Sequence, residues 1–484
     1  MLQSLKRLTR HSAIYGLSDV LGRSLSFLLV PVYTHVLSTE TYGYVALIYS
    51  FIGLMNVLFI YGMDSAFLRF YMLEESKKRQ TLSTGFITVA VSSLALAIGT
   101  VIGAPLIDAW ISPSADLSVF IRLSAIILLF DALSVIPFAR LRGEGKSSLF
   151  AGLKLAKVLL ELVGNYVLVV VMGMGLEGIL ISNIVGSGLT CSVLLLMTLP
   201  ALSWDWNRPR LTALLKFGIP YVPAGACVVI IELIDRFFLE RSAGPDVVGV
   251  YSATRKLGVG MLIFVNMFRL AWQPFFLETA RQEDARPIFA RVLTYFLLIT
   301  STVFLAVSLL IDYLVQTPFF GVTFFAEAYW DGIAVVPLFL LAYILYGLYV
   351  NLTVGVYLEK KTTTLPVITG LAAGASVLAN GLLIPVWGMK GAALASVVAY
   401  AIMVIGLYLV SRRSYPIPYE YGRLLRITLV CGGLFAIGQL WKGADGVLVR
   451  LALIVGYPIV LGITGFFNAQ EVGFVRRHLR LRES

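Results

Sequence analysis

The chain of 484 residues has few charged residues, few histidines and few cysteines, and each scarcity excludes a class of protein. Only 13% of the residues are charged, whereas soluble domains carry about 25%, so a soluble globular protein is excluded. The three histidines form no ligand-like cluster, and Cys191, Cys227 and Cys431 lie in apolar stretches, so we expect neither a metal site nor a disulfide framework. The glycine-rich phosphate-binding loop of nucleotide hydrolases is also missing, which argues against direct use of ATP.

Apolar residues are plentiful instead: they make up 58% of the chain, and the mean hydropathy is +0.88. We therefore predict an all-α polytopic membrane protein with about 14 transmembrane helices of about 20 residues or more. These spans lie near residues 12–36, 42–63, 82–110, 119–142, 147–172, 176–199, 216–240, 248–275, 288–312, 332–358, 363–386, 390–411, 421–441 and 447–467. The first span is too long for a signal-peptide core and lacks a small-residue cleavage site, so we expect it to be retained.

Basic residues gather in the connections on one side of the predicted spans. That side carries Lys77, Lys78, Arg79, Arg140, Arg142, Lys146, Arg208, Arg210, Lys216, Arg281, Arg286, Lys360, Lys361, Arg412, Arg413, Arg476, Arg477, Arg480 and Arg482, whereas the other side has only Arg241, Lys390, Lys442 and Arg450. Positive charge marks the cytoplasmic side of a membrane protein, so both termini are predicted to be cytoplasmic. This distribution explains the net charge of +11 without a nucleic-acid partner.

Two glycine-containing turns recur along the chain and indicate an internal repeat. Gly43 and Gly249 each open a span, and Gly175 and Gly388 each lie in a turn between spans; the members of each pair are about 210 residues apart. Matching places in an even number of spans predict two parallel six-helix lobes, as in transporters that rock two halves about a central site. We therefore expect an N-lobe at 1–200, a cytoplasmic linker at 201–215, a C-lobe at 216–412, and an extra helix pair with a basic tail at 413–484.

Two acid–arginine pairs lie inside predicted spans, where charges are costly. Asp19 and Arg23 are in the first span, and Glu232 and Arg236 are in the seventh. A spacing of four residues places each pair on one helix face, so the acid can partly neutralise the arginine. Such residues usually face a polar cavity, which predicts an anion-binding path; buried pairs that only fix helix packing are the alternative.

Other charged or polar residues in or near the spans extend the candidate path. Planar guanidinium groups can hold a phosphate in two places, so the further candidates for substrate binding are Arg69, Arg255, Arg269 and the neighbouring Asn266. The candidates for ion coupling or gating are Asp131, Glu161 and Asp235, together with Asp19 and Glu232. Membrane-interface positions for the arginines and hydrogen-bonded packing roles for the acids remain alternatives. We assign no catalytic residue.

Several short motifs, in their order and spacing, resemble the polysaccharide-synthesis flippases of the multidrug, oligosaccharidyl-lipid and polysaccharide exporter superfamily. They are Pro31-Val32-Tyr33-Thr34, Tyr42-Gly43, Phe217-Gly218-Ile219-Pro220, Asp235-Arg236-Phe237-Phe238-Leu239, Val248-Gly249-Val250-Tyr251, Ala271-Trp272-Gln273-Pro274-Phe275 and the turn from Gly388 to Ala393. The resemblance covers nearly the whole chain. The extra helix pair is also found in the related lipid II flippases, where it forms a groove for the lipid tail.

The resemblance implies a flippase of the bacterial cytoplasmic membrane, rather than an enzyme. It would move an undecaprenyl-diphosphate-linked oligosaccharide from the inner to the outer leaflet by alternating access, for cell-surface polysaccharide synthesis. Arg23 and Arg255 would meet the diphosphate or acidic sugars. Membrane lipid, a polysaccharide polymerase and glycosyltransferases are the implied partners, and no cofactor is expected beyond coupling to a proton gradient, a sodium gradient or the membrane potential. A cation-coupled multidrug exporter of the same superfamily and a membrane glycosyltransferase or ligase are the alternatives.

Overall fold

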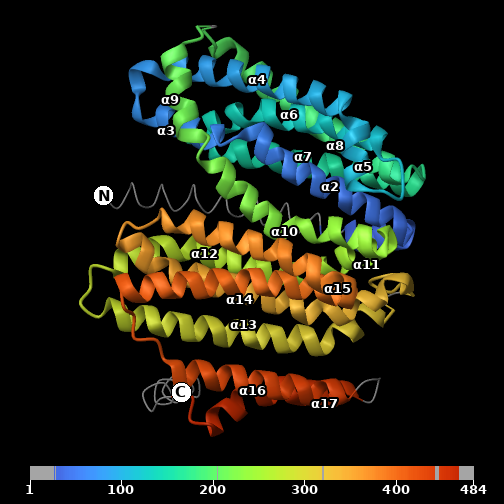
Figure 1. Cartoon of the computed structure of the whole chain (residues 1–484), viewed down its shortest axis with the longest axis vertical. Coiled ribbons are helices and arrows are strands. Elements are labelled where there is room, and N and C mark those ends of the chain that lie inside the picture. Colours follow the sequence, from blue (N-terminus) through green and yellow to red (C-terminus); the bar gives the residue numbers. More distant parts are fainter. Residues whose placement is uncertain (1–26, 28, 204, 319–320, 442–445, 468–484) are drawn as a thin grey trace, which may run out of the picture. The chain divides into compact units, whose positions relative to one another are not determined.

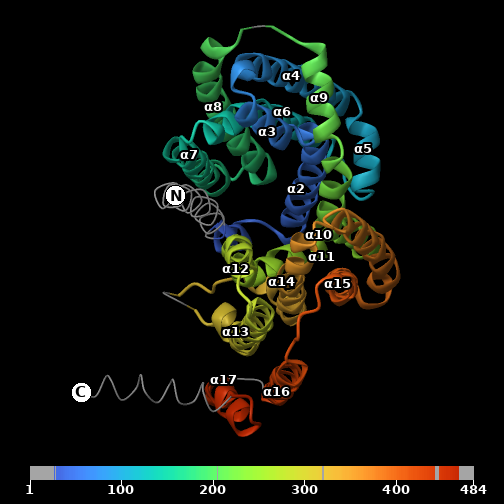
Figure 2. The ribbon, with the colours of Figure 1, turned by 90° about the vertical axis from the view of Figure 1, so that its left-hand side faces the viewer.

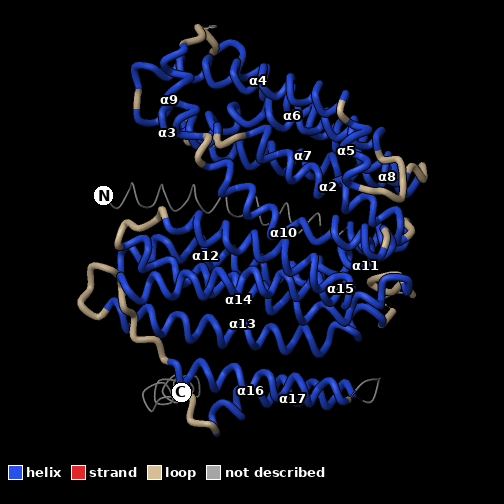
Figure 3. Tube along the Cα trace, in the orientation of Figure 1, coloured by secondary structure: helices blue, strands red, loops and turns tan. Residues whose placement is uncertain are grey.

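The protein is helical in most of the chain that its structure describes. The structure is a computed structural model, and it describes residues 27, 29–203, 205–318, 321–441 and 446–467. Within these residues there are helices joined by loops and no β-strand (Figure 3). The described residues form two compact units, which comprise different parts of the chain.

Unit 1 contains the described residues up to Leu257 together with Phe325–Val335 and Leu365–Ala399. Its helices are α2 (Thr39–Ile60), α3 (Met63–Leu73), α4 (Lys78–Ile102), α5 (Ala104–Ile111), α6 (Ser118–Gly143), α7 (Ser147–Asn165), the π-helical η2 (Tyr166–Val171), α8 (Gly175–Thr198), α9 (Arg208–Gly218), α10 (Tyr221–Ala243), α11 (Pro245–Arg255), η5 (Glu327–Val335) and the first part of α15 (Thr364–Ser414). Short helical turns also occur at η1 (Glu75–Lys77) and η3 (Leu199–Ala201). Figures 1 and 2 show α4, α6 and α8 as neighbouring rods, and α4 and α8 both pack on α6.

Unit 2 contains Gly258–Phe324, Val336–Thr364 and the described residues from Tyr400 onward. Its helices are α12 (Val259–Thr279), α13 (Ala285–Gln316), α14 (Val336–Leu358), the last part of α15, α16 (Tyr421–Leu440) and α17 (Gly446–Ile463). Along the chain, the turn η4 (Lys256–Gly258) contains the boundary between the two units. Helix α14 packs on α12 and α13, and α16 packs on α13 and α17. The division into two lobes and a linker stays a prediction, and the predicted linker includes the start of α9 at Arg208.

The predicted spans have helical counterparts throughout the described residues. Within the part of the chain that the structure describes, eleven helices are long and apolar enough to cross a membrane. One of them, α15, carries two predicted spans joined at Gly388, whose φ of +52° breaks the helix. The fifth predicted span corresponds to α7 and η2, which are not among the eleven, and most of the first span lies outside the described residues. The predicted all-α polytopic fold is therefore confirmed.

Gly43 and Gly249, one pair of glycines in the predicted repeat, lie at a close contact between α2 and α11 in unit 1. A Cβ atom on Gly43 of α2 would lie 1.9 Å from the carbonyl oxygen of Pro245, and one on Gly249 of α11 would lie 1.9 Å from the carbonyl oxygen of Thr39. Each carbonyl belongs to the residue four positions before the opposite glycine, so the contact is reciprocal. The Thr39 hydroxyl also donates to the Asp246 carboxylate. Only glycine permits the backbones of α2 and α11 to approach this closely.

The start of α9 is anchored to the loop after α3. Asn207 caps the helix, because its side chain accepts a hydrogen bond from the Arg210 amide. The Arg210 guanidinium is 6% exposed and lies 2.6 Å from a Glu74 carboxylate oxygen. This hydrogen bond holds the pKa of Glu74 below its usual value. The ion pair therefore ties the segment after α8 to the α3–α4 corner.

Helix α17 is joined to α13 by a buried arginine of unit 2. Arg450 is 2% exposed; its Nε donates to the Trp441 carbonyl at 3.0 Å and its Nη1 to the Leu309 carbonyl at 2.8 Å. Nη1 also lies 3.4 Å from Asp312. Because Leu309 and Asp312 lie in α13, this arginine joins the extra helix pair to the rest of unit 2. Its place in the sequence suggested a loop at the membrane surface, and the structure instead buries it.

Candidate functional site

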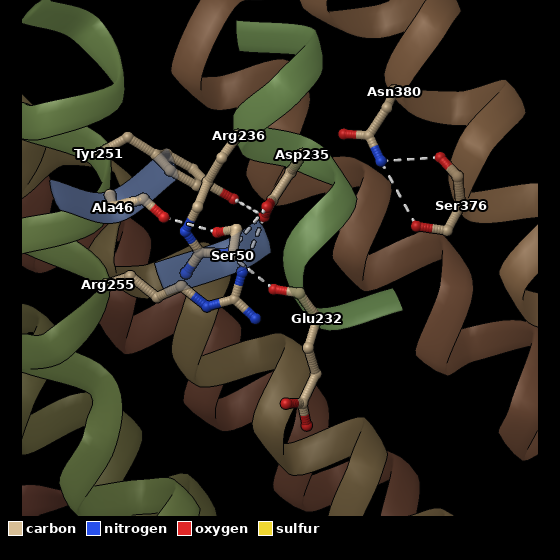
Figure 4. Close-up of polar contacts among 9 residues, drawn as sticks. All are labelled: Ala46, Ser50, Glu232, Asp235, Arg236, Tyr251, Arg255, Ser376 and Asn380. Carbon is tan, nitrogen blue, oxygen red and sulfur yellow. Dashed lines mark hydrogen bonds and ion pairs between the residues drawn. The ribbon is translucent and has the colours of Figure 1, made fainter. Parts of the chain in front are cut away.

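A buried cluster of charges joins α10 to α11 (Figure 4). Asp235 is 1% exposed. Its Oδ2 accepts hydrogen bonds from Arg255 Nη1 at 2.7 Å and from the Tyr251 hydroxyl at 2.5 Å, and its Oδ1 lies 3.2 Å from Arg236 Nη1. A carboxylate in an apolar span is expensive unless it is paired and hydrogen-bonded, and Asp235 is both.

The turn between α10 and α11 places these side chains together. Gly244 ends α10 with a φ of +83°, and Pro245 follows at the first turn of α11. This order of glycine and proline stops one helix and starts the next. The two helices then pack on each other, so residues eight to eleven positions on either side of the turn can meet, as Asp235 and Arg255 do.

The cluster carries more positive than negative charge among its members. Two guanidinium groups, of Arg236 and Arg255, share the single Asp235 carboxylate. The expected Glu232–Arg236 ion pair is wrong: Arg236 Nη1 donates to the backbone carbonyl of Glu232 at 2.9 Å, and Figure 4 shows the Glu232 carboxylate pointing away from both arginines. Arg236 pairs instead with Asp235, the residue directly before it.

A second charged group lies on α6 and α7. Lys157 Nζ is 2.7 Å from Asp131 Oδ1 and 3.7 Å from Glu161 Oε1. The side chains of Asp131 and Lys157 are 35% and 22% exposed, although both lie well inside predicted spans. Ser182 of α8 donates to the Glu161 carbonyl at 2.9 Å, just before the π-helical η2. The two acids that sequence reasoning singled out thus share one lysine.

Asp131 and Lys157 line a cavity of about 280 Å³ within unit 1. Five helices, α2, α3, α6, α7 and α8, contribute its walls, which consist of Asn56, Ile60, Asp64, Asp131, Ser134, Val135, Phe138, Arg142, Phe150, Lys154, Lys157 and Thr190. Arg142 and Asp64, which lie 3.9 Å apart, mark the end of the cavity nearest the basic connections. The cavity therefore runs from the predicted cytoplasmic side toward the middle of the spans.

The remaining predicted residues belong to neither of these two groups as the structure describes them. Arg69 is exposed, and its guanidinium lies 4.5 Å from the centre of the Phe217 ring. Asn266 and Arg269 belong to α12 in unit 2, where Arg269 Nη1 donates to the Tyr346 hydroxyl at 2.9 Å. Asp19 and Arg23 lie outside the described residues. Among the described residues, no group of three or more potential ligands could hold a metal ion.

Sequence reasoning missed the two lysines of α7 and an acid at the end of α10. Lys154 and Lys157 lie within the fifth predicted span, and Lys157 is four residues before Glu161, so the spacing that revealed the other pairs also applied here. Glu240, which is 4% exposed, accepts hydrogen bonds from Ser112 and Ser114, each at 2.7 Å. Nothing in the sequence near Glu240 indicates these partners, because they come from the loop after α5.

Known structures share this arrangement of helices. The inward closed conformation of the lipid II flippase MurJ matches with a TM-score of 0.75 and 15% sequence identity, over 93% of this chain and 98% of that one. An inward-facing multidrug resistance transporter of the MATE family, from the MOP superfamily, matches with a TM-score of 0.62 and 15% identity, over 84% of this chain and 95% of that one. A mutant of the Vibrio cholerae MATE transporter VcmN matches with a TM-score of 0.59 and 14% identity, over 84% of this chain and 96% of that one. At such identities the likeness shows the fold alone.

The sequence itself decides the family. No protein among the curated ones matches it. The family model described as polysaccharide biosynthesis protein matches residues 32–322. This range is more than half of the chain, and it contains both charged groups of unit 1. The chain therefore belongs to the polysaccharide biosynthesis protein family.

Proposed function

We propose that this protein is a flippase for a polyprenyl-diphosphate-linked oligosaccharide. It would carry the lipid from the cytoplasmic to the outer leaflet of the bacterial inner membrane by alternating access, with both termini in the cytoplasm, and so supply cell-surface polysaccharide synthesis. A polymerase and glycosyltransferases would act on either side of this step. Family membership and the MurJ-like fold support this class of transport.

The buried Asp235–Arg236–Arg255 cluster is the observation that carries the proposal. A diphosphate requires charge-assisted donors in a place that excludes water. Arg255, 8% exposed in an apolar span, offers such donors, and the Asp235 carboxylate contacts both Arg236 and Arg255. A diphosphate that took over Arg255 from Asp235 would leave Asp235 still paired with Arg236, so the exchange would strand no buried charge. Arg23 is the second arginine that we assign to the diphosphate.

The alternative of a multidrug exporter calls for a cavity that attracts organic cations. In the α6–α7 group the two acids share Lys157, and in the α10–α11 group the single acid faces two arginines. The second arrangement favours an anionic substrate over a cationic one. A glycosyltransferase or ligase would require acids or bases at the outer surface and room for a second substrate.

Transport across the bilayer in proteoliposomes would test the assignment. We expect the purified protein to move a fluorescent polyprenyl-diphosphate-linked oligosaccharide between leaflets. Arg255→Gln and Arg23→Gln should each slow transport by about tenfold or more, since each removes charge-assisted hydrogen bonds. Arg281→Gln, which removes a charge from an exposed loop, serves as the control. Unfolding temperatures of all variants separate lost binding from lost fold.

Three results would contradict the proposal in different ways. Full transport by both arginine variants would remove the arginines from the mechanism. Competition by organic cations without competition by polyprenyl diphosphate would favour the exporter. Transfer of sugar to an acceptor by the purified protein would favour the enzyme.

For ion coupling, we propose the acids rather than a bound cofactor. Glu232 is the described acid best suited to it, because its carboxylate forms no ion pair with any described residue (Figure 4), whereas Asp131, Glu161 and Asp235 all face cations. Asp19 is the candidate outside the described residues. Glu232→Gln should abolish the dependence of transport on a proton or sodium gradient and leave lipid binding intact; an unchanged dependence would overturn the assignment.

A further inference from the structure

The cavity lined by α2, α3, α6, α7 and α8 differs in chemistry from the arginine cluster. It presents both acids and cations: Lys157 lies 2.7 Å from Asp131, Arg142 lies 3.9 Å from Asp64, and Lys154 also lines the wall. The wall therefore carries charges of both signs and is rich in donors and acceptors. A diphosphate placed there would meet two carboxylates beside these cations, whereas the arginine cluster presents it with a single carboxylate.

Polar atoms on the cavity wall are available to a ligand. Within the described part of the chain, Asn56 Oδ1 and Arg142 Nε have no hydrogen-bond partner, although both atoms are buried. A buried polar atom without a partner costs free energy unless something in the site satisfies it. Asn56 comes from α2 and Arg142 from α6, so a ligand that satisfied both would bridge two walls.

Aromatic rings line one side of the same cavity. Phe138 and Phe150 pack edge to face with their ring centres 5.2 Å apart. The Lys154 ammonium lies 5.3 Å and 5.9 Å from these two ring centres. Such a wall offers apolar surface beside hydrogen-bonding groups, which is the combination that ligands with one apolar face and several hydroxyl groups require.

The geometry points to a saccharide subsite in this cavity. Paired acids and bases can each bridge neighbouring hydroxyl groups of a sugar, and the phenylalanine rings can contact its C–H face. A volume of about 280 Å³ is at the small end of ligand sites; it suits the first neutral sugars and excludes a polyprenyl tail. This inference rests on the proposed function and deepens it: the arginine cluster takes the diphosphate, and the cavity takes the sugars.

Two binding probes separate the two sites. The first is polyprenyl diphosphate, and the second is the same lipid carrying a neutral disaccharide. Val135 lines the cavity on α6, so Val135→Trp should fill it, whereas Val119→Trp places the same bulk on an exposed position of the same helix. We expect the wild type to bind the sugar-bearing probe more tightly. Val135→Trp should weaken that binding by about tenfold and change binding of the bare lipid by less than about twofold; Val119→Trp should change neither.

A second variant tests the same position if Val135→Trp fails to fold. Val135→Cys is nearly isosteric, and its alkylation by a maleimide should be slowed by the sugar-bearing probe and not by the bare lipid. Three results would overturn the saccharide subsite. Val135→Trp could weaken the binding of both probes equally or leave the binding of the sugar-bearing probe unaltered. Both probes could also slow the alkylation of Val135→Cys equally. Binding of neither probe by the wild type would instead overturn the proposed flippase function, so the two failures are distinguishable.

Discussion

Asp235 is the single residue on which the buried charges of α10 and α11 depend. It accepts from Arg255 and Tyr251 and pairs with Arg236. Its neighbour Glu232 lies on the same helix, is half-buried and points its carboxylate elsewhere (Figure 4). Two acids one turn apart therefore differ in their contacts: Asp235 joins the two helices, whereas Glu232 forms no ion pair with a described residue and is the acid that we propose for ion coupling.

Asp235→Ala should lower the free energy of unfolding by about 3–5 kcal/mol, because it leaves two buried guanidinium groups without their carboxylate. Glu232→Gln is the matched control, and we expect it to change stability by less than about 1 kcal/mol. Unfolding of the detergent-purified protein, followed by circular dichroism, measures both. Similar effects of the two substitutions would show that Asp235 has no special structural role.

At the scale of the elements, the helices follow from composition, whereas their charged partners do not. Runs of apolar residues suffice to locate a span, because a span is recognised by its length and hydropathy alone. The glycine turn in the sequence also indicates the break at Gly388. The pairing of Asp235 with Arg255 depends on how α11 folds back on α10, and a spacing rule within one helix cannot detect it. Lys157 was detectable by that same rule, from its spacing to Glu161, and was overlooked.

The contact between α2 and α11 should tolerate no side chain. In Gly249→Ala the new Cβ atom would lie 1.9 Å from the Thr39 carbonyl oxygen, so the two helices must separate. We expect a loss of about 1–3 kcal/mol in the free energy of unfolding, as for an overpacked core. Gly99→Ala in α4, where a Cβ atom meets nothing within 4 Å, should change stability by less than about 0.5 kcal/mol. Equal tolerance of both alanines would contradict the close approach.

The anchor between α9 and the α3–α4 corner should respond to acid. The Arg210 hydrogen bond lowers the pKa of Glu74 in the folded state, so its stabilising effect is complete above the pKa of an unfolded glutamate and disappears as the pH falls through the folded value. Wild type should therefore exceed Glu74→Gln in unfolding temperature near neutral pH, and the difference should vanish in acid. A difference that grows on acidification would exclude this ion pair as its source.

At the scale of the whole molecule, the distribution of basic residues predicts an orientation in the membrane that labelling can test. The loops before and after α6 lie at opposite ends of a single span, and the positive-inside rule assigns the loop after α6 to the cytoplasm. In a Cys227→Ala background, Ala115→Cys should react with a membrane-impermeant maleimide in intact cells. Ser148→Cys, at the exposed start of α7 directly after that loop, should react only after the membrane is opened. The reverse pattern would invert the proposed orientation.

The reciprocal glycine contact also bears on how such a chain could have arisen. Gly43 and Gly249 hold matching places in the two predicted repeats, and each meets the carbonyl four residues before the other. A two-fold axis would convert one contact into the other, which is the property of an isologous interface. A single ancestral half with one such glycine would have met a second copy of itself through these same atoms. Fusion of two copies then requires no new interface, only a connecting segment.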